Sequence, residues 1–94
     1  MTDQDRKNEL EERCKRNVLT ALNGFPFIAL KLANIRAAEP AVFSVFSDDE
    51  IGTALKDLAE RGHVERVRKE IEPSVKYWKI TVKGRDFIKE EGMG

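Results

Sequence analysis

The sequence predicts an α+β domain in which helices precede a β-hairpin and one further helix follows it. Three observations support this prediction: an amphipathic segment that ends at Gly62, two short runs of strand-forming residues after it, and Thr81 placed to cap a last helix. At 94 residues the chain has the length of one domain, so residues 1–94 are taken as a single unit. Hydrophobic residues make up 40% and charged residues 36%, which fits a globular protein with a heavily charged surface.

A long first helix is expected within residues 1–22, beginning near Asp3. Its apolar stripe has the spacing of one buried helix face and consists of Leu10, Cys14, Val18, Ala21 and Leu22. Asn23 and Gly24 follow, and both tolerate the left-handed backbone that often ends a helix. Cys14 is the only cysteine, so an internal disulfide is excluded and the side chain is expected to pack as a small apolar group.

The next segment is less regular. Pro26 suits the first turn of a second helix, because its missing N–H costs nothing there. This helix is expected to end near residues 37–38, before Pro40. Residues 41–46 are apolar and β-branched or aromatic, so they form either a short strand that pairs with the edge of the hairpin or a buried connector.

The third helix has the clearest start signal. Ser47 followed by Glu50 fits a capping box, and the acids of this first turn suit the positive end of the helix dipole. The helix is expected over residues 47–61, burying Ile51, Ala54, Leu55 and Leu58. A hairpin over residues 63–81 and a last helix over residues 82–91 follow. Alternation along the second strand puts Trp78 and Ile80 on one face, which favours burial of Trp78.

Charge is divided unequally along the chain, although the formal net charge is zero. Residues 62–85 hold seven bases and three acids, a local net charge of +4. Residues 47–61 hold five acids and two bases, a local net charge of −3. The hairpin is therefore basic and the helix before it acidic, a distribution that bears on which partner the domain would attract.

Two runs within Leu55–Arg85 resemble a known fold: Leu55…Leu58…Gly62-His63-Val64-Glu65-Arg66 and Tyr77-Trp78-Lys79-Ile80-Thr81-Val82-Lys83-Gly84-Arg85. They resemble the winged-helix DNA-binding domains of the MarR, PadR and ArsR families over about a third of the chain. Upstream, Val18–Leu22 and the 38–46 connector are similar to small winged-helix proteins of Mu-like prophages. The resemblance implies a winged helix-turn-helix with a long N-terminal helix and a C-terminal helix after the wing.

That resemblance also implies a function, a small transcriptional regulator that binds double-stranded DNA. Residues 47–61 would be the recognition helix and residues 63–81 the wing. The implied DNA contacts are Thr53 and Lys56 on the helix and, on the wing, Arg66, Arg68, Lys69, Lys76 and Lys79. The two terminal helices would form a homodimer surface, with Leu10, Phe87 and Ile88 as the candidate contacts.

Two observations support a different interpretation of the function. The helix exposes Asp48, Asp49 and Asp57, whereas DNA-reading helices generally present Ser, Thr, Gln, Asn, Arg or Lys. The wing bases could equally form a solvated hairpin with cross-strand Glu–Lys pairs. The alternative function is a winged-helix module that binds a basic protein partner and no DNA.

Catalysis is not expected. The chain has one histidine, His63, and one cysteine, and it contains no Ser/His/Asp set, phosphate-binding glycine loop or Cys-x-x-Cys pair. Asp48, Asp49 and Glu50 are explained by the helix cap, so no metal or other cofactor is expected. The N-terminus lacks the apolar core of a signal peptide and no apolar run could span a bilayer, so a cytoplasmic location without membrane contact is expected.

Overall fold

The computed structural model describes residues 2–72 and 74–92, which form five helices and one three-stranded antiparallel sheet. In chain order the elements are α1 (Asp3–Asn23), β1 (Leu30–Lys31), α2 (Leu32–Ala38), α3 (Pro40–Phe43), α4 (Asp48–Glu60), β2 (Val64–Val67), β3 (Tyr77–Ile80) and α5 (Val82–Glu91). This architecture is α+β, as the sequence predicts. Within the described ranges, none of the helices is long and apolar enough to cross a bilayer.

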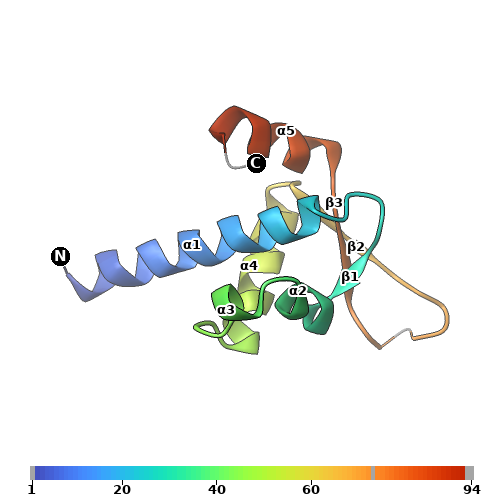
Figure 1. Ribbon diagram of the computed structural model, residues 1–94, viewed down its shortest axis with the longest axis horizontal. Coiled ribbons are helices and arrows are strands. Elements are labelled where there is room, and N and C mark those ends of the chain that lie inside the picture. The colour runs from blue at the N-terminus through green and yellow to red at the C-terminus, as the bar shows by residue number, and fades with distance from the viewer. Residues whose placement is uncertain (1, 73, 93–94) are drawn as a thin grey trace.

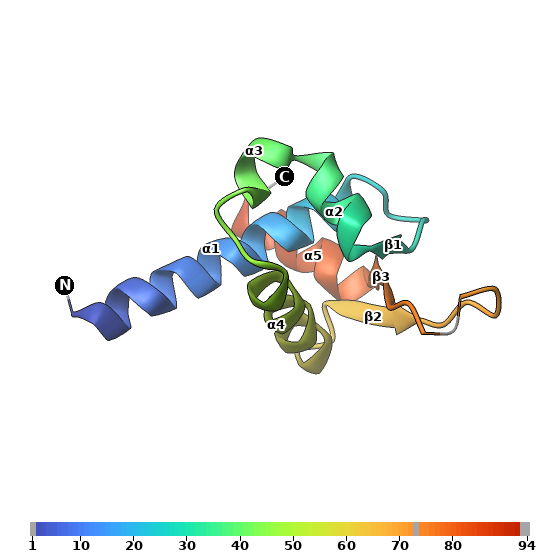
Figure 2. The same ribbon diagram turned by 90° about the horizontal axis from the view of Figure 1, so that it is seen from below.

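Helix α1 is the central element of the molecule. It packs most extensively on α4, and in Figure 1 it lies between α5 on one side and the α2–α4 group on the other. The N-terminal half of α1 and the tip of the β2–β3 hairpin extend from opposite ends of the molecule in both views (Figures 1 and 2). These two extensions account for the elongated outline of 46 × 28 × 24 Å.

The core forms where the C-terminal half of α1 meets α4 and the sheet. Its largest side chains with almost no exposed surface are Phe43, Leu19, Leu22, Ile35, Ile51 and Leu55. Cys14 is 2% exposed and packs in this core, which confirms the expectation that it serves as an apolar group. Leu10, the first member of the predicted stripe, is 42% exposed, because this part of α1 extends beyond the elements that cover Cys14.

The sheet has the strand order β1-β3-β2, so β3 is central. Val64 pairs with Ile80 and Leu30 pairs with Trp78, which places these four side chains on the face that packs on the core. Trp78 is 6% exposed, and its predicted burial is confirmed. The paired strands are shorter than the hairpin expected over residues 63–81, because the ladder stops at Val67 and Tyr77.

Between α1 and α4 the predicted elements are wrong in two respects. The helix expected to begin at Pro26 starts at Leu32 instead, after a turn and strand β1. Leu30 forms a ladder with β3, and this long-range pairing overrides the local helical signal of the proline. Gly24 has a right-handed backbone with φ −66°, and its N–H donates to the carbonyl of Ala21 at 3.2 Å, so α1 ends without a left-handed residue.

Residues 41–46, all described, form no strand. They contain the end of the short helix α3, which begins at Pro40, a position where the absent N–H is not needed. Phe43 and Phe46 are 0% and 4% exposed, so the alternative of a buried connector is the one observed. The strand that joins the hairpin edge is β1, at a position where no strand is predicted.

The predicted caps of the last two helices are confirmed. The Ser47 hydroxyl accepts a hydrogen bond from the Glu50 N–H at 3.1 Å, and the Glu50 carboxylate accepts one from the Ser47 N–H at 2.9 Å. Helix α4 is followed by Gly62, whose φ of +80° is a conformation that a side chain would strain. Thr81 caps α5 by accepting a hydrogen bond from the Gly84 N–H at 3.0 Å.

Candidate functional site

A groove of about 420 Å³ lies between α4, the β2–β3 hairpin and the β1–α2 junction. We call it the α4–hairpin groove. Its lining residues are Lys31, Leu32, Ala33, Gly52, Leu55, Lys56, Ser74, Val75, Lys76 and Trp78. Three of them are lysines and, within the described ranges, none is a carboxylate. The groove therefore has an apolar interior, and its charged lining residues are all positive.

Each lysine of the groove comes from a different element. Lys56 stands on α4 one turn after Gly52, and Lys76 directly precedes β3. Lys31 ends β1, and its backbone N–H donates to the Asn34 side chain at 3.3 Å, which fixes the start of α2. The ammonium groups of Lys56 and Lys76 belong to exposed residues, so they can reach a ligand from solvent. The fold thus brings three lysine residues that are far apart in the sequence to the lining of one groove.

The interior of the groove is formed by side chains that belong to the core. Leu55 is 1% exposed and Trp78 is 6% exposed, so only a small part of each faces the groove. Gly52 lies on the helical wall, and beyond its chain neighbours and the backbone of its own helix no heavy atom lies within 4 Å of the position its Cβ would take. Any larger residue at this position would project its side chain into open space, so glycine keeps this stretch of α4 accessible.

The acids of α4 do not face this groove as free charges. The Asp48 carboxylate lies 2.7 Å from the Arg36 guanidinium, and the Asp57 carboxylate lies 3.3 Å from the Lys15 ammonium. Lys15 belongs to α1, the helix that packs most extensively on α4. The local charge of −3 counted along residues 47–61 is therefore partly balanced by bases from elsewhere in the chain.

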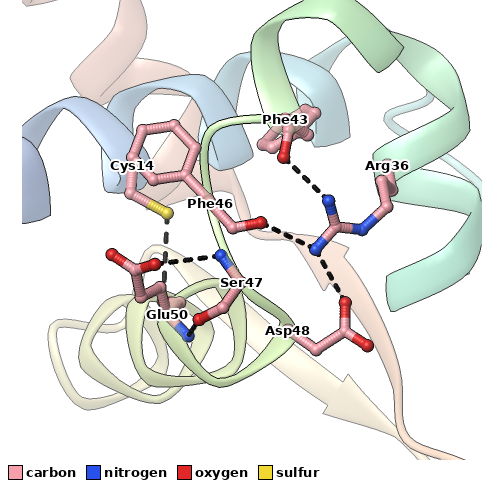
Figure 3. A network of polar contacts seen from close by, with 7 residues as sticks. All are labelled: Cys14, Arg36, Phe43, Phe46, Ser47, Asp48 and Glu50. Carbon is pink, nitrogen blue, oxygen red and sulfur yellow. Dashed lines mark hydrogen bonds and ion pairs between the residues drawn. The ribbon is translucent and has the colours of Figure 1, made fainter.

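Arg36 also fixes the start of α4 relative to α2 (Figure 3). Its guanidinium donates to the carbonyl oxygens of Phe43 at 2.8 Å and Phe46 at 2.9 Å as well as to Asp48. One side chain thus holds together α2, the connector and the first turn of α4. Hydrogen bonds to a charged donor are among the stronger ones in proteins, so this cluster positions the helix that carries Lys56.

The opposite flank of α4 has a different character. A hollow of about 360 Å³ there is lined by Lys7, Leu10, Glu11, Asp49, Glu50, Thr53 and Ala54. Thr53, expected beside Lys56 as a DNA contact, lies in this hollow next to α1 rather than in the α4–hairpin groove. Leu10 lies there too and is the exposed member of the proposed dimer contacts. Ile88 is 2% exposed and packs in the core, so its side chain is not offered to a second copy.

The expected wing contacts fall on two faces of the hairpin. Arg66 pairs with Trp78 across the ladder, so it lies on the same face as Trp78 and the groove. Lys76 lines the groove itself, as described above. Arg68 follows the last residue of β2 and is exposed. Of the wing bases, Lys76 and Arg66 are those that the register and the groove place on the α4 side.

Lys69 and Lys79 belong to the other face. Lys79 pairs with Glu65 across the ladder, the Glu–Lys arrangement expected of a solvated hairpin. The Lys69 ammonium lies 4.2 Å from the centre of the Tyr77 ring, a cation–π contact. The Tyr77 hydroxyl donates to the Glu72 carboxylate at 2.8 Å, which raises the pKa of the tyrosine. Lys69 therefore has a partner within the hairpin, and Lys79 lies opposite Glu65 in the ladder. Lys31 pairs with Tyr77 and lines a hollow with Lys69 as well as the α4–hairpin groove, so it borders both faces.

Lys31 is the groove residue that the sequence did not identify. The Pro26 signal predicts that Lys31 lies within a helix, whereas the structure places it at the end of β1. Strand β1 has only two residues, too few for the alternation that reveals a strand. In the sequence, the position of Lys31 between Leu30 and Leu32 is the one local feature that indicates alternation.

His63 is a second titratable group that the fold places unusually. It is 8% exposed, its ring stacks on Phe87 with centroids 4.6 Å apart, and its Nδ1 has no hydrogen-bond partner among the described residues. Burial, together with the nearby charges of Lys83 and Arg61, lowers the pKa of His63. It lies on the α5 side of the hairpin, outside the groove.

Comparison with known proteins does not identify the chain. No family model, curated protein or solved structure matches it. In the part of the chain that the structure describes, no group of three or more His, Cys, Asp or Glu side chains is arranged to hold a metal ion. Function is therefore inferred from the α4–hairpin groove and its surroundings.

Proposed function

We propose that the protein is a winged-helix domain that binds double-stranded DNA through the α4–hairpin groove. The order of elements supports this: a long helix, a short strand, helices leading to α4, and then a two-stranded hairpin packed beside it. In such a domain α4 is the recognition helix and the β2–β3 hairpin is the wing. The single observation that carries the proposal is that Lys31, Lys56 and Lys76 line one groove whose described lining holds no carboxylate.

The groove lysines suit phosphate binding because α4, the hairpin and the β1–α2 junction each contribute one of them to the lining of one surface. A DNA major groove is about 12 Å wide and admits an α-helix. With α4 in that groove, Lys56 would reach a base edge or phosphate while Lys31 and Lys76 contact the flanking backbone. Gly52 allows the helix to approach the duplex closely, since no side chain separates that turn from it.

The acids of α4 weigh less against this function than their number implies. Asp48 and Asp57 are paired with Arg36 and Lys15, and the partner of Asp57 lies on α1. Asp49 lines the hollow on the α1 flank. Asp49→Asn is therefore expected to raise the affinity for duplex, because it removes a carboxylate whose charge is not balanced by an ion pair of this kind.

The test is a fluorescence anisotropy titration with random duplex DNA at low salt. Three phosphate contacts imply a slope of about −2.7 for log K against log salt, so doubling the salt should weaken binding about sixfold. Replacing Lys31, Lys56 and Lys76 together by Gln should remove most of the binding and most of this slope. Absence of binding at tens of micromolar protein would refute the proposal, since non-specific binders reach roughly that range.

A matched variant controls for net charge. It replaces three lysines outside the groove by Gln: Lys7, Lys69 and Lys79. Both triple variants lose the same formal charge, so only the position of the lysines differs. Equal loss of binding in the two variants would show that DNA is attracted by overall charge and not by the groove.

One observation favours the alternative function, a protein-binding module that does not bind DNA. The loop between α1 and β1 exposes Phe25 (45%), Phe27 (80%) and Ile28 (54%), an amount of apolar surface that monomeric domains usually limit. A basic partner on the acidic helix is less supported, because two of its acids are already paired. If Phe27→Ser abolishes capture of a partner while duplex binding is absent in every variant, the alternative is the correct one.

A further inference from the structure

The hollow that Lys31 and Lys69 share has a volume of about 640 Å³ and lies beside strand β1. We call it the β1 hollow. Its lining also includes Phe25, Ile28, Leu30 and Tyr77. Trp78 lines the α4–hairpin groove and Tyr77 lines the β1 hollow, because neighbouring residues of a strand point to opposite faces. The β1 hollow is therefore a separate surface from the one proposed to bind DNA.

The loop between α1 and β1 holds apolar side chains in solvent through its own backbone. The Phe25 N–H donates to the carbonyl of Leu22 at 3.0 Å, and the Ile28 N–H donates to the carbonyl of Phe25 at 3.1 Å. Phe25, Phe27 and Ile28 are thus displayed on a hydrogen-bonded turn, as at an interaction site. This loop and the free half of α1 lie at opposite ends of the molecule (Figure 1), so α1 of the same chain does not cover it.

The charges that border this apolar surface are positive. The charged residues of the lining are the two lysines, and within the described ranges the lining contains no carboxylate. The Arg85 guanidinium lies 5.8 Å from the centre of the Phe27 ring and adds a third cation. The nearby Glu72 carboxylate already accepts the Tyr77 hydroxyl at 2.8 Å. An apolar surface bordered by cations favours a partner that supplies carboxylates.

We propose that the β1 hollow binds an acidic peptide segment of another protein that carries two apolar side chains. The apolar side chains would contact Phe25, Ile28 and Tyr77, while carboxylates meet the ammonium groups of Lys31 and Lys69. A second copy of this chain fits the surface less well, because a symmetric contact would bring the same cations together. The charge of the surface therefore selects an acidic partner.

This interaction does not depend on the proposed function. The peptide and the duplex would occupy separate surfaces, and Lys31 is the lining residue that they share. A contact of this size belongs to the weak, transient class, so the acidic partner would bind and leave readily. With both sites occupied, the domain would bring an acidic protein to DNA.

The first experiment titrates the full chain, labelled with ¹⁵N, with three capped octapeptides of Asp and Glu in which Phe and Leu stand two, three or four positions apart. At least one should shift the amides of Phe25, residues 27–31 and Tyr77. Its counterpart with Asn and Gln in place of the acids should bind about tenfold more weakly, since each exposed ion pair contributes up to roughly fivefold. Absence of shifts from all three at millimolar concentration would overturn the proposal. Shifts centred on residues 52–56 would also overturn it, because they place the peptide in the α4–hairpin groove.

Two variants test the surface itself. Ile28→Ser removes an exposed apolar contact, so the protein should stay folded and bind the peptide about tenfold more weakly. Lys69→Gln should weaken binding about fivefold. The matched controls are Val45→Ser, also an exposed apolar position, and Lys7→Gln; neither residue lines the hollow, so both should bind as the wild type does. Equal peptide affinity of Ile28→Ser and Val45→Ser would contradict the proposal.

Duplex titration and sedimentation separate the other outcomes. Ile28 does not line the α4–hairpin groove, so Ile28→Ser should leave duplex affinity unchanged. If the peptide binds at the hollow but duplex never binds, the docking surface stands and the DNA function fails; the reverse result removes the docking surface alone. A concentration-dependent dimer that Ile28→Ser abolishes would show that a second copy occupies the hollow, and the proposal would then be wrong.

Discussion

Replacing Gly52 by alanine is expected to stabilise the protein. Gly52 lies within α4, a helix of 13 residues, and glycine in a helix interior costs about 1 kcal/mol relative to alanine. No steric cost offsets this gain, because nothing lies within 4 Å of the added Cβ. The entropy of unfolding is about 2.1 cal/mol/K per residue, or roughly 200 cal/mol/K for 94 residues, so Tm should rise by about 5 °C.

The measurement is thermal unfolding followed by circular dichroism or calorimetry under identical conditions. The control is Gly84→Ala, where the added Cβ would collide with the backbone carbonyl of His63 and crowd Ile80. That collision should cost about 3 kcal/mol and lower Tm by roughly 15 °C. A Tm for Gly52→Ala equal to or below that of the wild type would refute the reasoning.

The same substitution connects stability with function. Because the new methyl group projects into the α4–hairpin groove, the stabilised variant should bind duplex more weakly than the wild type. A gain in stability accompanied by a loss of binding is the usual compromise at a functional surface. If Gly52→Ala raised both Tm and DNA affinity, close approach of α4 to the duplex would not be the role of this glycine.

Three further predictions concern the supports of the fold. Arg36→Met should lower the free energy of unfolding by about 2 kcal/mol in urea titrations, because the carbonyls of Phe43 and Phe46 lose a charged donor; a loss below 0.5 kcal/mol would contradict this. Burial and the charge of Glu50 raise the pKa of the Cys14 thiol to about 11, so native protein should resist thiol-labelling reagents that modify it rapidly once unfolded. His63 has a lowered pKa, so the unfolded state binds more protons, and stability should fall as pH drops below 6.5; His63→Leu should flatten this slope between pH 7 and 5.5.

Local signals in the sequence were sufficient for the long helices and the hairpin. The Ser47–Glu50 capping box, the Gly62 stop and the Thr81 cap each act within a few residues, so their consequences could be predicted correctly. Trp78 was placed in the core by alternation alone. These are features in which local preference and tertiary structure agree.

Features that depend on distant partners could not be predicted. Strand β1 exists because Leu30 meets Trp78, and a helix signal at Pro26 gave no indication of that pairing. The net charge of residues 47–61 is a sum along the sequence. In the structure, Lys15 and Arg36 form ion pairs with acids of α4, although both bases lie far from them in the sequence. Lys31 entered the groove for the same reason, since the β1–α2 junction that carries it is positioned by the sheet.

The free N-terminal half of α1 implies that this helix does not unfold as one unit. Residues 2–13 are all exposed, and short helical segments with few tertiary contacts are only marginally stable in water. The Thr2 cap and the Glu9–Arg13 ion pair each add no more than about 1 kcal/mol. The first turns should therefore melt and reform many times during the lifetime of one folded molecule, and their amide protons should exchange with solvent far sooner than those from Cys14 to Leu22.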